Sequence, residues 1–362
     1  MTVNKNLYKK GLFASMAVMM TSLFLLSCGS NPSAKTGNLQ ETKAEEDLIT
    51  VGFSQIGAES DWRLACTESV ESAFTTENGF NLIFDDGQQK QENQLKAIRE
   101  FIDMDVDYII LDPITEEGWD SALQEAKEAG IPVIIVDRQI SVKDDSLYTA
   151  WVGADFRTEG DRAVGWLSTV LASQKGFINF VHIQGTTGAT AQIGRTEALK
   201  DGIVNHNRWV LLAREDADFV QAKGREVMED FLKRYGSRIN VCYCENDNEA
   251  YGALQAISAA GYRAGQDIDQ GEILVVSFDA TRQGLRYTMD GSISMNMECN
   301  PLFGPKLTEV VKALNRGEAV NRITYMEEQQ FVHDDALQSF RYDGNAYPLT
   351  TVTEDVLAGR KY

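Results

Sequence analysis

The feature that most constrains the fold is an alternation of short apolar runs with helix-like segments, which begins at Ile49. In the stretch 49–63, ITVGFSQIGAESDWR, apolar β-forming residues give way to a polar turn, and helical spacing starts at Trp62. The same order recurs along most of the chain. Strands that alternate with helices form parallel sheets that helices cover on both faces. The sequence therefore predicts an α/β fold.

The alternation falls into two similar halves of about a hundred residues each. In the first half we expect strands at 49–53, 81–84, 108–111 and 133–136, with helical apolar faces at Leu95, Ile98 and Ile102 and at Trp119, Leu123 and Ala126. After a connection near 148–155 we expect strands at 177–183, 209–213, 239–244 and 273–278, and helices around 163–171, from 191, at 222–232 and at 249–260. The tail adds a strand after Ser292, a helix around 307–314 and a strand near 323–326.

The first 28 residues have the pattern of an export signal. Three lysines precede an apolar stretch from Gly11 to Leu26, which ends in Leu-Leu-Ser-Cys at Cys28. This order resembles a lipoprotein signal peptide over residues 1–27, which implies that Cys28 is the lipidated first residue of the mature chain. An uncleaved anchor helix or a plain secretory signal is the alternative. Residues 28–47 are polar, and we expect a flexible tether there.

Charge and cysteine usage exclude several classes of protein. The formal net charge of −20 over 362 residues repels phosphate backbones, so we expect no nucleic acid partner. Cys66, Cys242, Cys244 and Cys299 do not form a disulfide framework, because the only close pair is two residues apart on one strand face. We therefore expect these cysteines to be buried thiols. The three histidines are scattered, so we expect no metal site.

Polar side chains follow nearly every expected strand. They are Ser54 and Gln55, the stretch 86–89, Asp112, Asp137 with Arg138, the stretch 184–186, the stretch 245–247, and Asp279. In an open parallel sheet ligands bind outside the carboxyl ends of the strands, so we expect these groups at one crevice. Carboxylates, amides and guanidinium groups form paired hydrogen bonds that suit vicinal sugar hydroxyls, and Phe53, Trp62 and Phe278 offer flat apolar surfaces.

Other interpretations of these residues remain open at this point. Any one of the polar residues could instead cap a helix. The Gly/Thr-rich stretch 184–194 could hold an anion, although a tight turn with a cap fits its pattern better. Asp137 and Asp279 could in principle hydrolyse a glycoside, but the chain has no GxSxG, HExxH or P-loop motif. We therefore expect a binding protein and not an enzyme, with no cofactor.

Three segments of the first half and three of the second resemble one family in order. They are TVGFSQIGAESDWR from Thr50, DDGQQKQENQ from Asp85, IPVIIVDRQI from Ile131, QGTTGATAQIGR up to Arg195, END from Glu245 and VSFDA from Val276. These segments resemble the periplasmic sugar-binding proteins of ABC importers, in the ribose/galactose-type group, and within it the galactofuranose-binding proteins.

The resemblance implies a type I periplasmic binding protein: two Rossmann-like lobes with parallel sheets, joined by a three-stranded hinge. It implies an N-terminal lobe of residues 48–153 plus 298–326 and a C-terminal lobe of 154–297 plus 327–362. The ligand-binding residues that it implies are Gln55, Glu59, Ser60, Trp62, Arg63, Asp137, Arg138, Arg195, Asn246, Asp279 and Glu298.

The function that the resemblance implies is capture of a monosaccharide, galactofuranose or a related sugar, for delivery to the membrane permease of an ABC importer. The protein is then a monomer in the periplasm or at the cell surface, anchored to the membrane through a lipid on Cys28. The alternative is a sensor that presents a bound sugar or autoinducer to a membrane receptor. A repressor of similar fold needs a basic helix-turn-helix in front, where this chain has a signal peptide and an acidic tether.

Overall fold

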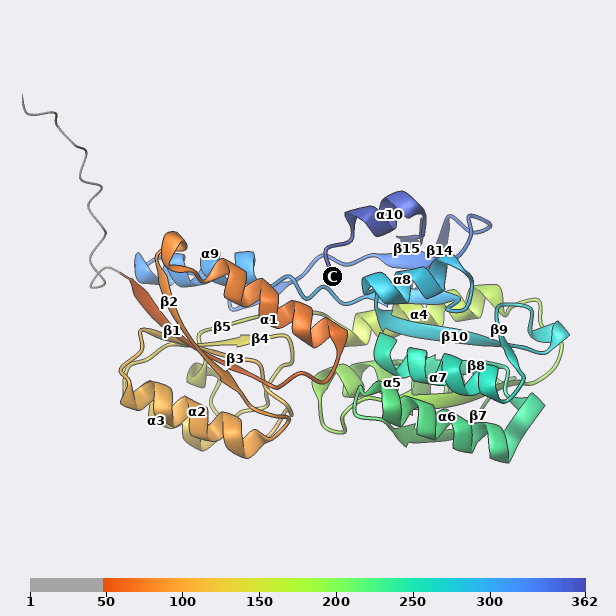
Figure 1. The fold of residues 1–362 in the computed structure, drawn as a ribbon, viewed down its shortest axis with the longest axis horizontal. Helices are drawn as coiled ribbons and strands as arrows, with labels where there is room; N and C mark the ends of the chain where they lie inside the picture. Colours follow the sequence, from red (N-terminus) through yellow and green to blue (C-terminus); the bar gives the residue numbers. More distant parts are fainter. Residues whose placement is uncertain (1–47) are drawn as a thin grey trace, which may run out of the picture. The chain divides into compact units, whose positions relative to one another are not determined.

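The first of the two large sheets is fully parallel and has six strands in the order β12-β5-β4-β3-β1-β2 (Figure 1). The structure is a computed structural model that describes residues 48–362, so the expected signal peptide, Cys28 and the tether lie outside the described residues. The strands are β1 (Ile49–Gln55), β2 (Phe80–Asp86), β3 (Tyr108–Leu111), β4 (Val133–Val136), β5 (Ala150–Gly153) and β12 (Ile323–Tyr325). We call this sheet with its helices the first lobe.

Both faces of this sheet are buried, as the unbroken apolar runs predict. In β3, Tyr108 and Ile110 join one core while Ile109 and Leu111 join the core on the opposite face, because side chains alternate along a strand. Helices α1 (Asp61–Ala73) and α9 (Gly304–Asn315) pack together over the first core, and α2 (Gln91–Asp103) and α3 (Asp120–Glu128) pack over the other. The predicted strands and helices of the first half are confirmed, but β5 was not predicted, because its four residues lie in the stretch 148–155 that we expected to be a connection.

The second sheet has eight strands: seven lie in the order β16-β13-β11-β10-β8-β6-β7, and β9 pairs with β10. Their bounds are β6 (Ile178–Gln184), β7 (Trp209–Asp216), β8 (Val241–Cys244), β9 (Arg263–Ala264), β10 (Glu272–Asp279), β11 (Met295–Glu298), β13 (Gln330–Val332) and β16 (Thr350–Thr351). One face is covered by α4 (Phe156–Val170) and α5 (Thr190–Asn205), and the other by α6 (Gln221–Tyr235) and α7 (Asp247–Ala259). This sheet with its helices is the second lobe.

The chain passes from one sheet to the other at three places, which we call crossings. The first is residues 154–155 between β5 and α4, the second is 299–303 between β11 and α9, and the third is 326–329 between β12 and β13. β13 runs antiparallel to β11, because it re-enters the second lobe at the end where β11 leaves it. The α/β fold with parallel sheets is confirmed, with the antiparallel pair β11–β13 added to the second sheet, while the lobe boundaries given above stay predictions.

The C-terminal segment holds elements that periodicity did not predict. Strands β14 (Ser339–Tyr342) and β15 (Asn345–Pro348) form a hairpin whose turn residues, Asp343 and Gly344, have φ values of 46° and 79°. Positive φ at both central turn positions suits the right-handed twist of the hairpin. Two short helices, α8 (Arg282–Met289) and α10 (Glu354–Gly359), share a small core with β13.

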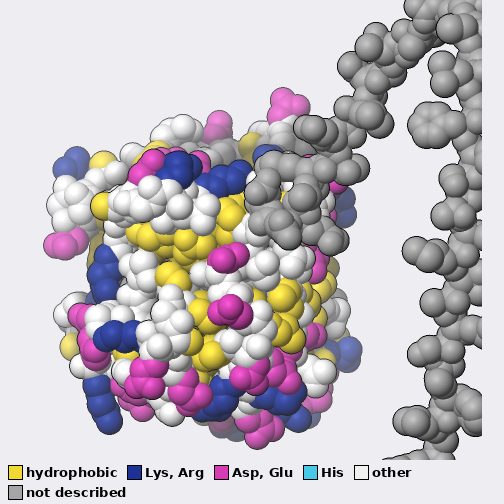
Figure 2. All heavy atoms as spheres, turned by 90° about the vertical axis from the view of Figure 1, so that its left-hand side faces the viewer, with side chains coloured by type: hydrophobic (Ala, Val, Ile, Leu, Met, Phe, Trp, Pro, Cys, Tyr) yellow, Lys and Arg dark blue, Asp and Glu magenta, His cyan; other side chains and the backbone are white. Residues whose placement is uncertain are grey.

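Charges of both signs lie on the surface of the protein. Figure 2 shows apolar side chains across the middle of one face, with Lys, Arg, Asp and Glu side chains around them. Both edge strands of the first lobe expose apolar side chains, Phe84 on β2 and Ile323 and Tyr325 on β12. None of the helices within residues 48–362 has the length and apolar character that a membrane span requires.

Candidate functional site

A buried arginine organises the carboxyl ends of the first-lobe strands. The chain leaves β1, turns, and enters α1 at Ser60, whose Oγ accepts a hydrogen bond of 3.2 Å from the Arg63 backbone N. This cap turns the first face of α1 toward the strand ends. Arg63 Nη2 lies 2.7 Å from Asp137 Oδ2 and 3.2 Å from Glu59 Oε1, and its Nη1 pairs with Asp112.

The charge of Arg63 is maintained by these neighbours. Burial alone disfavours the guanidinium charge, but the carboxylates of Asp112, Asp137 and Glu59 outweigh burial and raise the pKa of Arg63 well above its usual value. Burial also raises the pKa of Asp112, which Arg63 partly offsets. A cation that touches three carboxyl groups fixes all of them in position.

Arg138 follows β4 and carries the second cation of the first lobe. Its Nη2 donates a 2.6 Å hydrogen bond to Glu59 Oε1, and its Nη1 donates a 3.0 Å bond to the Ile114 carbonyl. Its Nε is buried and has no partner among the described residues. The guanidinium carbon lies 5.2 Å from the ring centre of Phe219, which belongs to the second lobe. Arg138 therefore contacts both lobes and keeps one donor without a partner among the described residues.

The second lobe contributes Arg195 on α5. Its Nη2 lies 2.7 Å from Glu159 Oε2 and 4.0 Å from Asp279 Oδ1, and its guanidinium carbon lies 4.6 Å from the ring centre of Phe278. Burial disfavours the charge of Arg195, but Glu159 more than compensates and raises its pKa. For the Asp279 carboxyl, burial raises the pKa well above its ordinary value, and Arg195 offsets only part of that rise.

Asp137 and Asp279 occupy corresponding positions at the ends of β4 and β10. Both have positive φ, 61° and 96°, although neither is glycine. Residues held in such sparsely populated conformations cost about 1–3 kcal/mol each and cluster at ligand sites. The two lobes thus present one carboxylate each in the same strained setting.

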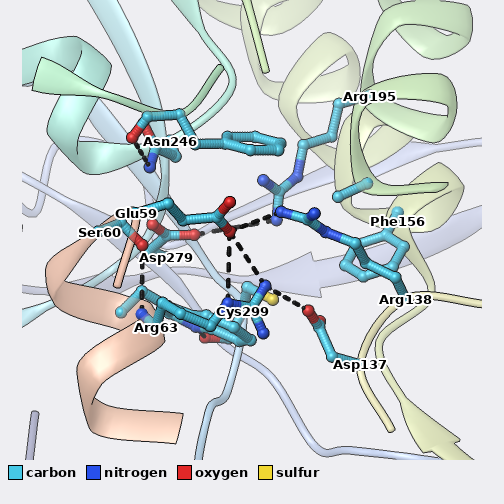
Figure 3. A pocket seen from close by; sticks show the side chains of 13 residues that line it. Glu59, Ser60, Arg63, Asp137, Arg138, Phe156, Arg195, Asn246, Asp279 and Cys299 are labelled. Carbon is cyan, nitrogen blue, oxygen red and sulfur yellow. Dashed lines mark hydrogen bonds and ion pairs between the residues drawn. The ribbon is translucent and has the colours of Figure 1, made fainter. Parts of the chain in front are cut away.

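A cavity lies where these groups meet (Figure 3). Its volume for water-sized molecules is only about 20 Å³, which is far below the range of about 300–1,000 Å³ that is typical of sites for drug-sized ligands. It is lined by Glu59, Ser60, Trp62, Arg63, Asp137, Arg138, Phe156, Ala191, Arg195, Phe219, Asn246, Asp279 and Cys299. Charged and amide side chains therefore share the lining with aromatic rings, and the two lobes close tightly around a small space.

Hydrogen bonds between the lobes flank the cavity. The Asp61 backbone N donates to Asn248 Oδ1 over 3.2 Å, and the Gln139 backbone N donates to Thr190 Oγ1 over 2.9 Å. A backbone bond of 2.9 Å joins Glu116 N to Gly188 O. The two lobes are in contact on both sides of the enclosed groups, as in the closed state of a hinged protein.

Comparison with known proteins identifies the family to which this chain belongs. The sequence family described as the periplasmic binding protein domain matches residues 51–317. The chain belongs to the periplasmic binding protein family. It is 37% identical over 300 residues to the galactofuranose-binding protein YtfQ of Escherichia coli (strain K12), covering 82% of this chain and 92% of that one.

Two solved structures that resemble the chain hold sugars. A Mycobacterium smegmatis protein in complex with β-D-fucofuranose is 41% identical, with a TM-score of 0.75, over 79% of this chain and 91% of that one. The periplasmic binding protein component of the arabinose ABC transporter from Shewanella sp. ANA-3, bound to α- and β-L-arabinofuranose, is 38% identical, with a TM-score of 0.73, over 78% and 92%. YtfQ and the Shewanella protein are named as binding proteins.

The structure brings nine of the eleven expected ligand-binding residues together around the cavity. They are Glu59, Ser60, Trp62, Arg63, Asp137, Arg138, Arg195, Asn246 and Asp279. Asn246 also caps α7, because its Oδ1 accepts a 2.8 Å hydrogen bond from the Glu249 backbone N, so the capping interpretation holds as well for this residue. Their contact with a ligand stays a prediction.

Gln55 and Glu298 do not line the cavity. The Gln55 side chain bonds to Thr67 Oγ1 over 3.1 Å and accepts from the Ile56 backbone N, which fixes the turn after β1. Glu298 ends β11 beside the second crossing, where its carboxyl pairs with Arg360 over 2.6 Å and with the Tyr362 hydroxyl over 2.9 Å. These contacts give both side chains partners within the protein.

The expected apolar surfaces and the Gly/Thr-rich stretch need correction. Of the three aromatic residues expected to face a ligand, Trp62 lines the cavity, whereas Phe53 and Phe278 are fully buried in the cores.

Gly188, in the stretch 184–194, has a φ of 86° and makes the expected tight turn. However, α5 begins without a side-chain cap.

Four lining residues were not predicted: Phe156, Ala191, Phe219 and Cys299. Phe219 follows β7, as the other site residues follow their strands, but the sequence pattern ended that strand at 213 instead of Asp216. The signal was therefore present but misplaced by three residues. Phe156 and Cys299 lie at the first and second crossings, which periodicity does not identify.

Proposed function

We propose that this protein is an extracytoplasmic solute-binding lipoprotein that captures a monosaccharide between its lobes and delivers it to the permease of an ABC importer. The observation that carries the proposal is the convergence of Arg63, Arg138 and Asp137 from the first lobe with Arg195 and Asp279 from the second on one small cavity. The proposed sugar is in the five-membered furanose form, galactofuranose or a close relative. The relatives named above, at 37–41% identity, bind galactofuranose, fucofuranose and arabinofuranose.

The chemistry of the cavity suits a polyol. Each sugar hydroxyl can donate to a carboxylate and accept from a guanidinium, so neighbouring hydroxyls are held by pairs of charge-assisted hydrogen bonds. Asp279, which receives no side-chain hydrogen bond from any described residue, and Arg138 Nε, which donates none, are the groups with free capacity. Trp62, Phe156 and Phe219 supply flat apolar surfaces for the C–H faces of the ring.

Binding is coupled to closure because the ligand groups are divided between the lobes. A sugar that contacts both lobes stabilises the closed arrangement more than the open one, and the crossings serve as the hinge. We expect micromolar or tighter affinity, about −8 kcal/mol or better.

The proposed partner and the proposed location have separate support. A relative at 38% identity is the binding component of an arabinose ABC transporter, which supports a permease as the partner of this protein. The lipoprotein pattern that ends at Cys28 supports attachment to the membrane surface through a lipid. The site chemistry is that of binding alone, with no reaction and no cofactor.

Thermal unfolding with a panel of pentoses and hexoses tests the proposal. A ligand present at a hundred times its Kd stabilises the folded state by about 2.7 kcal/mol. Ring size is separated with 1,4-anhydrohexitols, which are locked as five-membered rings, and the matched 1,5-anhydrohexitols, which are locked as six-membered rings. We expect stabilisation by the five-membered compounds. If no sugar in either ring form stabilises the protein, the proposal is wrong.

A further inference from the structure

Side chains from each crossing or its immediate neighbour meet at one buried point beside the cavity. Glu159 lies in the first turn of α4, directly after the first crossing, Cys299 lies in the second crossing, and Glu328 lies in the third. One carboxyl oxygen of each glutamate and the Cys299 sulfur all lie within 4.8 Å of one another. This cluster is distinct from the expected ligand residues, and it touches the cavity only through Cys299.

The two carboxyl groups have capacity that no described residue satisfies. Glu159 is fully buried, and its Oε2 accepts from Arg195 at 2.8 Å, but its Oε1 has no partner. Oε1 of Glu328 is also enclosed without a partner. Two carboxylates at this separation disfavour joint ionisation, and two buried acceptor oxygens without a donor are costly. One donor between the two carboxyl groups removes both penalties.

The surrounding charges favour a protonated carboxyl group, and not a metal ion, between the two carboxyl groups. Burial and the neighbouring Glu159 raise the pKa of the Glu328 carboxyl, against the opposing effects of Arg162 and Arg195. Burial likewise raises the pKa of Glu159, which Arg195 offsets in part, and burial raises the pKa of the Cys299 thiol. A divalent cation would need the thiolate and would lie near two guanidinium groups, so a proton is the less costly solution.

We propose that Glu328 is protonated in the closed protein and donates a hydrogen bond to Glu159. This hydrogen bond fixes Glu159, which in turn positions Arg195 for the ligand. Glu159 then receives a hydrogen bond on each oxygen, one from Glu328 and one from Arg195. Glu328 is a positioning residue in this arrangement, since it acts on the cavity through Glu159. Its effect on ligand affinity rests on the sugar-binding function proposed above, whereas its protonation does not.

The first experiment needs no ligand. In the folded protein the pair keeps its proton to a higher pH than a free carboxyl group does, so folding takes up a proton in that interval. Stability from this pair is therefore lost as pH rises through the folded-state pKa. Glu328→Gln keeps a donor toward Glu159 at every pH, so we expect its unfolding temperature to gain on the wild type as pH rises from 5 to 8.

A matched control is Glu298→Gln, a neighbouring carboxylate that is already paired with Arg360. This variant should lose stability across the same pH range, because it gives up an ion pair. If Glu328→Gln behaves in the same way as Glu298→Gln, the protonated pair is refuted.

The second experiment measures sugar affinity by calorimetry from pH 5 to 8. We expect the wild type to lose affinity with rising pH relative to Glu328→Gln, by at most about tenfold per pH unit for one linked proton. Glu328→Ala, which has no donor, should bind more weakly than Glu328→Gln at every pH. Equal pH profiles for the wild type and Glu328→Gln would overturn the positioning role.

A metal arm completes the test. Zinc chloride added to the sugar-free protein should leave its unfolding temperature unchanged. Stabilisation by stoichiometric zinc that Cys299→Ser abolishes would replace the proton with a metal ion and refute the proposal. If no sugar binds at all, the proposed function fails, while the ligand-free comparison of Glu328→Gln with the wild type still decides whether the pair holds a proton.

Discussion

Replacing Asp279 with Asn should make the free protein more stable and its sugar binding weaker. The substitution keeps the size of the side chain and removes its charge. Asp279 is buried, and the nearest cation, Arg195, is 4.0 Å away and already paired with Glu159 at 2.7 Å. The loss of the Asp279 charge therefore leaves no cation unpaired. Asn also tolerates the φ of 96° at this position.

The magnitudes follow from the burial of the carboxylate. Because burial raises the pKa of Asp279, its ionised form costs free energy at pH 7, about 1.4 kcal/mol for each pKa unit. We expect Asp279→Asn to recover about 1 kcal/mol, which raises Tm by roughly 1–2 °C, because the unfolding entropy is about 2.1 cal/mol/K per residue. A hydrogen bond from a sugar hydroxyl to a charged group contributes about 1.5–3 kcal/mol, so affinity should fall about 10- to 150-fold.

Asp137→Asn is the matched control. Asp137 occupies the corresponding strand end and also has a positive φ, but it makes a 2.7 Å ion pair with buried Arg63. Neutralising a partner in such a pair destabilises, so this variant should lose stability while Asp279→Asn gains it. Thermal unfolding without ligand and calorimetry with the selected sugar measure both effects. A loss of stability in Asp279→Asn, or an unchanged Kd, would refute the reasoning.

Three further outcomes are expected. Asn248→Ala removes the 3.2 Å bond from the Asp61 backbone N across the lobes, and should weaken sugar binding by about 1 kcal/mol while the unfolding temperature of the sugar-free protein hardly changes; an equal loss in both measurements would contradict a role in closure. Gly304→Ala places a Cβ against the Ser69 carbonyl oxygen, and chemical denaturation should show a loss of about 1–3 kcal/mol of stability. Gly317→Ala is the control, because its added Cβ meets no atom within 4 Å and only its φ of 71° carries a cost. Four described cysteines are free and buried: Cys66, Cys242, Cys244 and Cys299. They should react with a thiol reagent only on unfolding, and rapid reaction in the native protein would contradict their burial.

Much of the fold could be predicted because local pattern and tertiary context agree. The runs at Tyr108–Leu111 and Val133–Val136 are apolar on both faces, which only a covered parallel strand tolerates, and both were predicted with their observed bounds. The C-terminal segment could not be predicted in the same way. β13 and β16 are three and two residues long, and long-range pairing rather than periodicity determines them.

For the candidate site too, the sequence predicted the residues at the ends of strands but not those in helices and connections. Asp137 and Arg138 directly follow β4 and Asp279 ends β10, so the topology of parallel sheets places them at the carboxyl ends of the strands. The groups that hold the arginines were less visible. Glu159 lies inside a helix and Glu328 in a connection, and their proximity arises only because the chain crosses between the lobes three times.

The most direct test is a crystal structure of the protein with the sugar that stabilises it most. A sugar ring bound in the cavity, with hydroxyl groups hydrogen-bonded to Arg138 of the first lobe and to Asp279 of the second, is the predicted result. A sugar bound outside that cavity, or held by one lobe alone, would contradict the account.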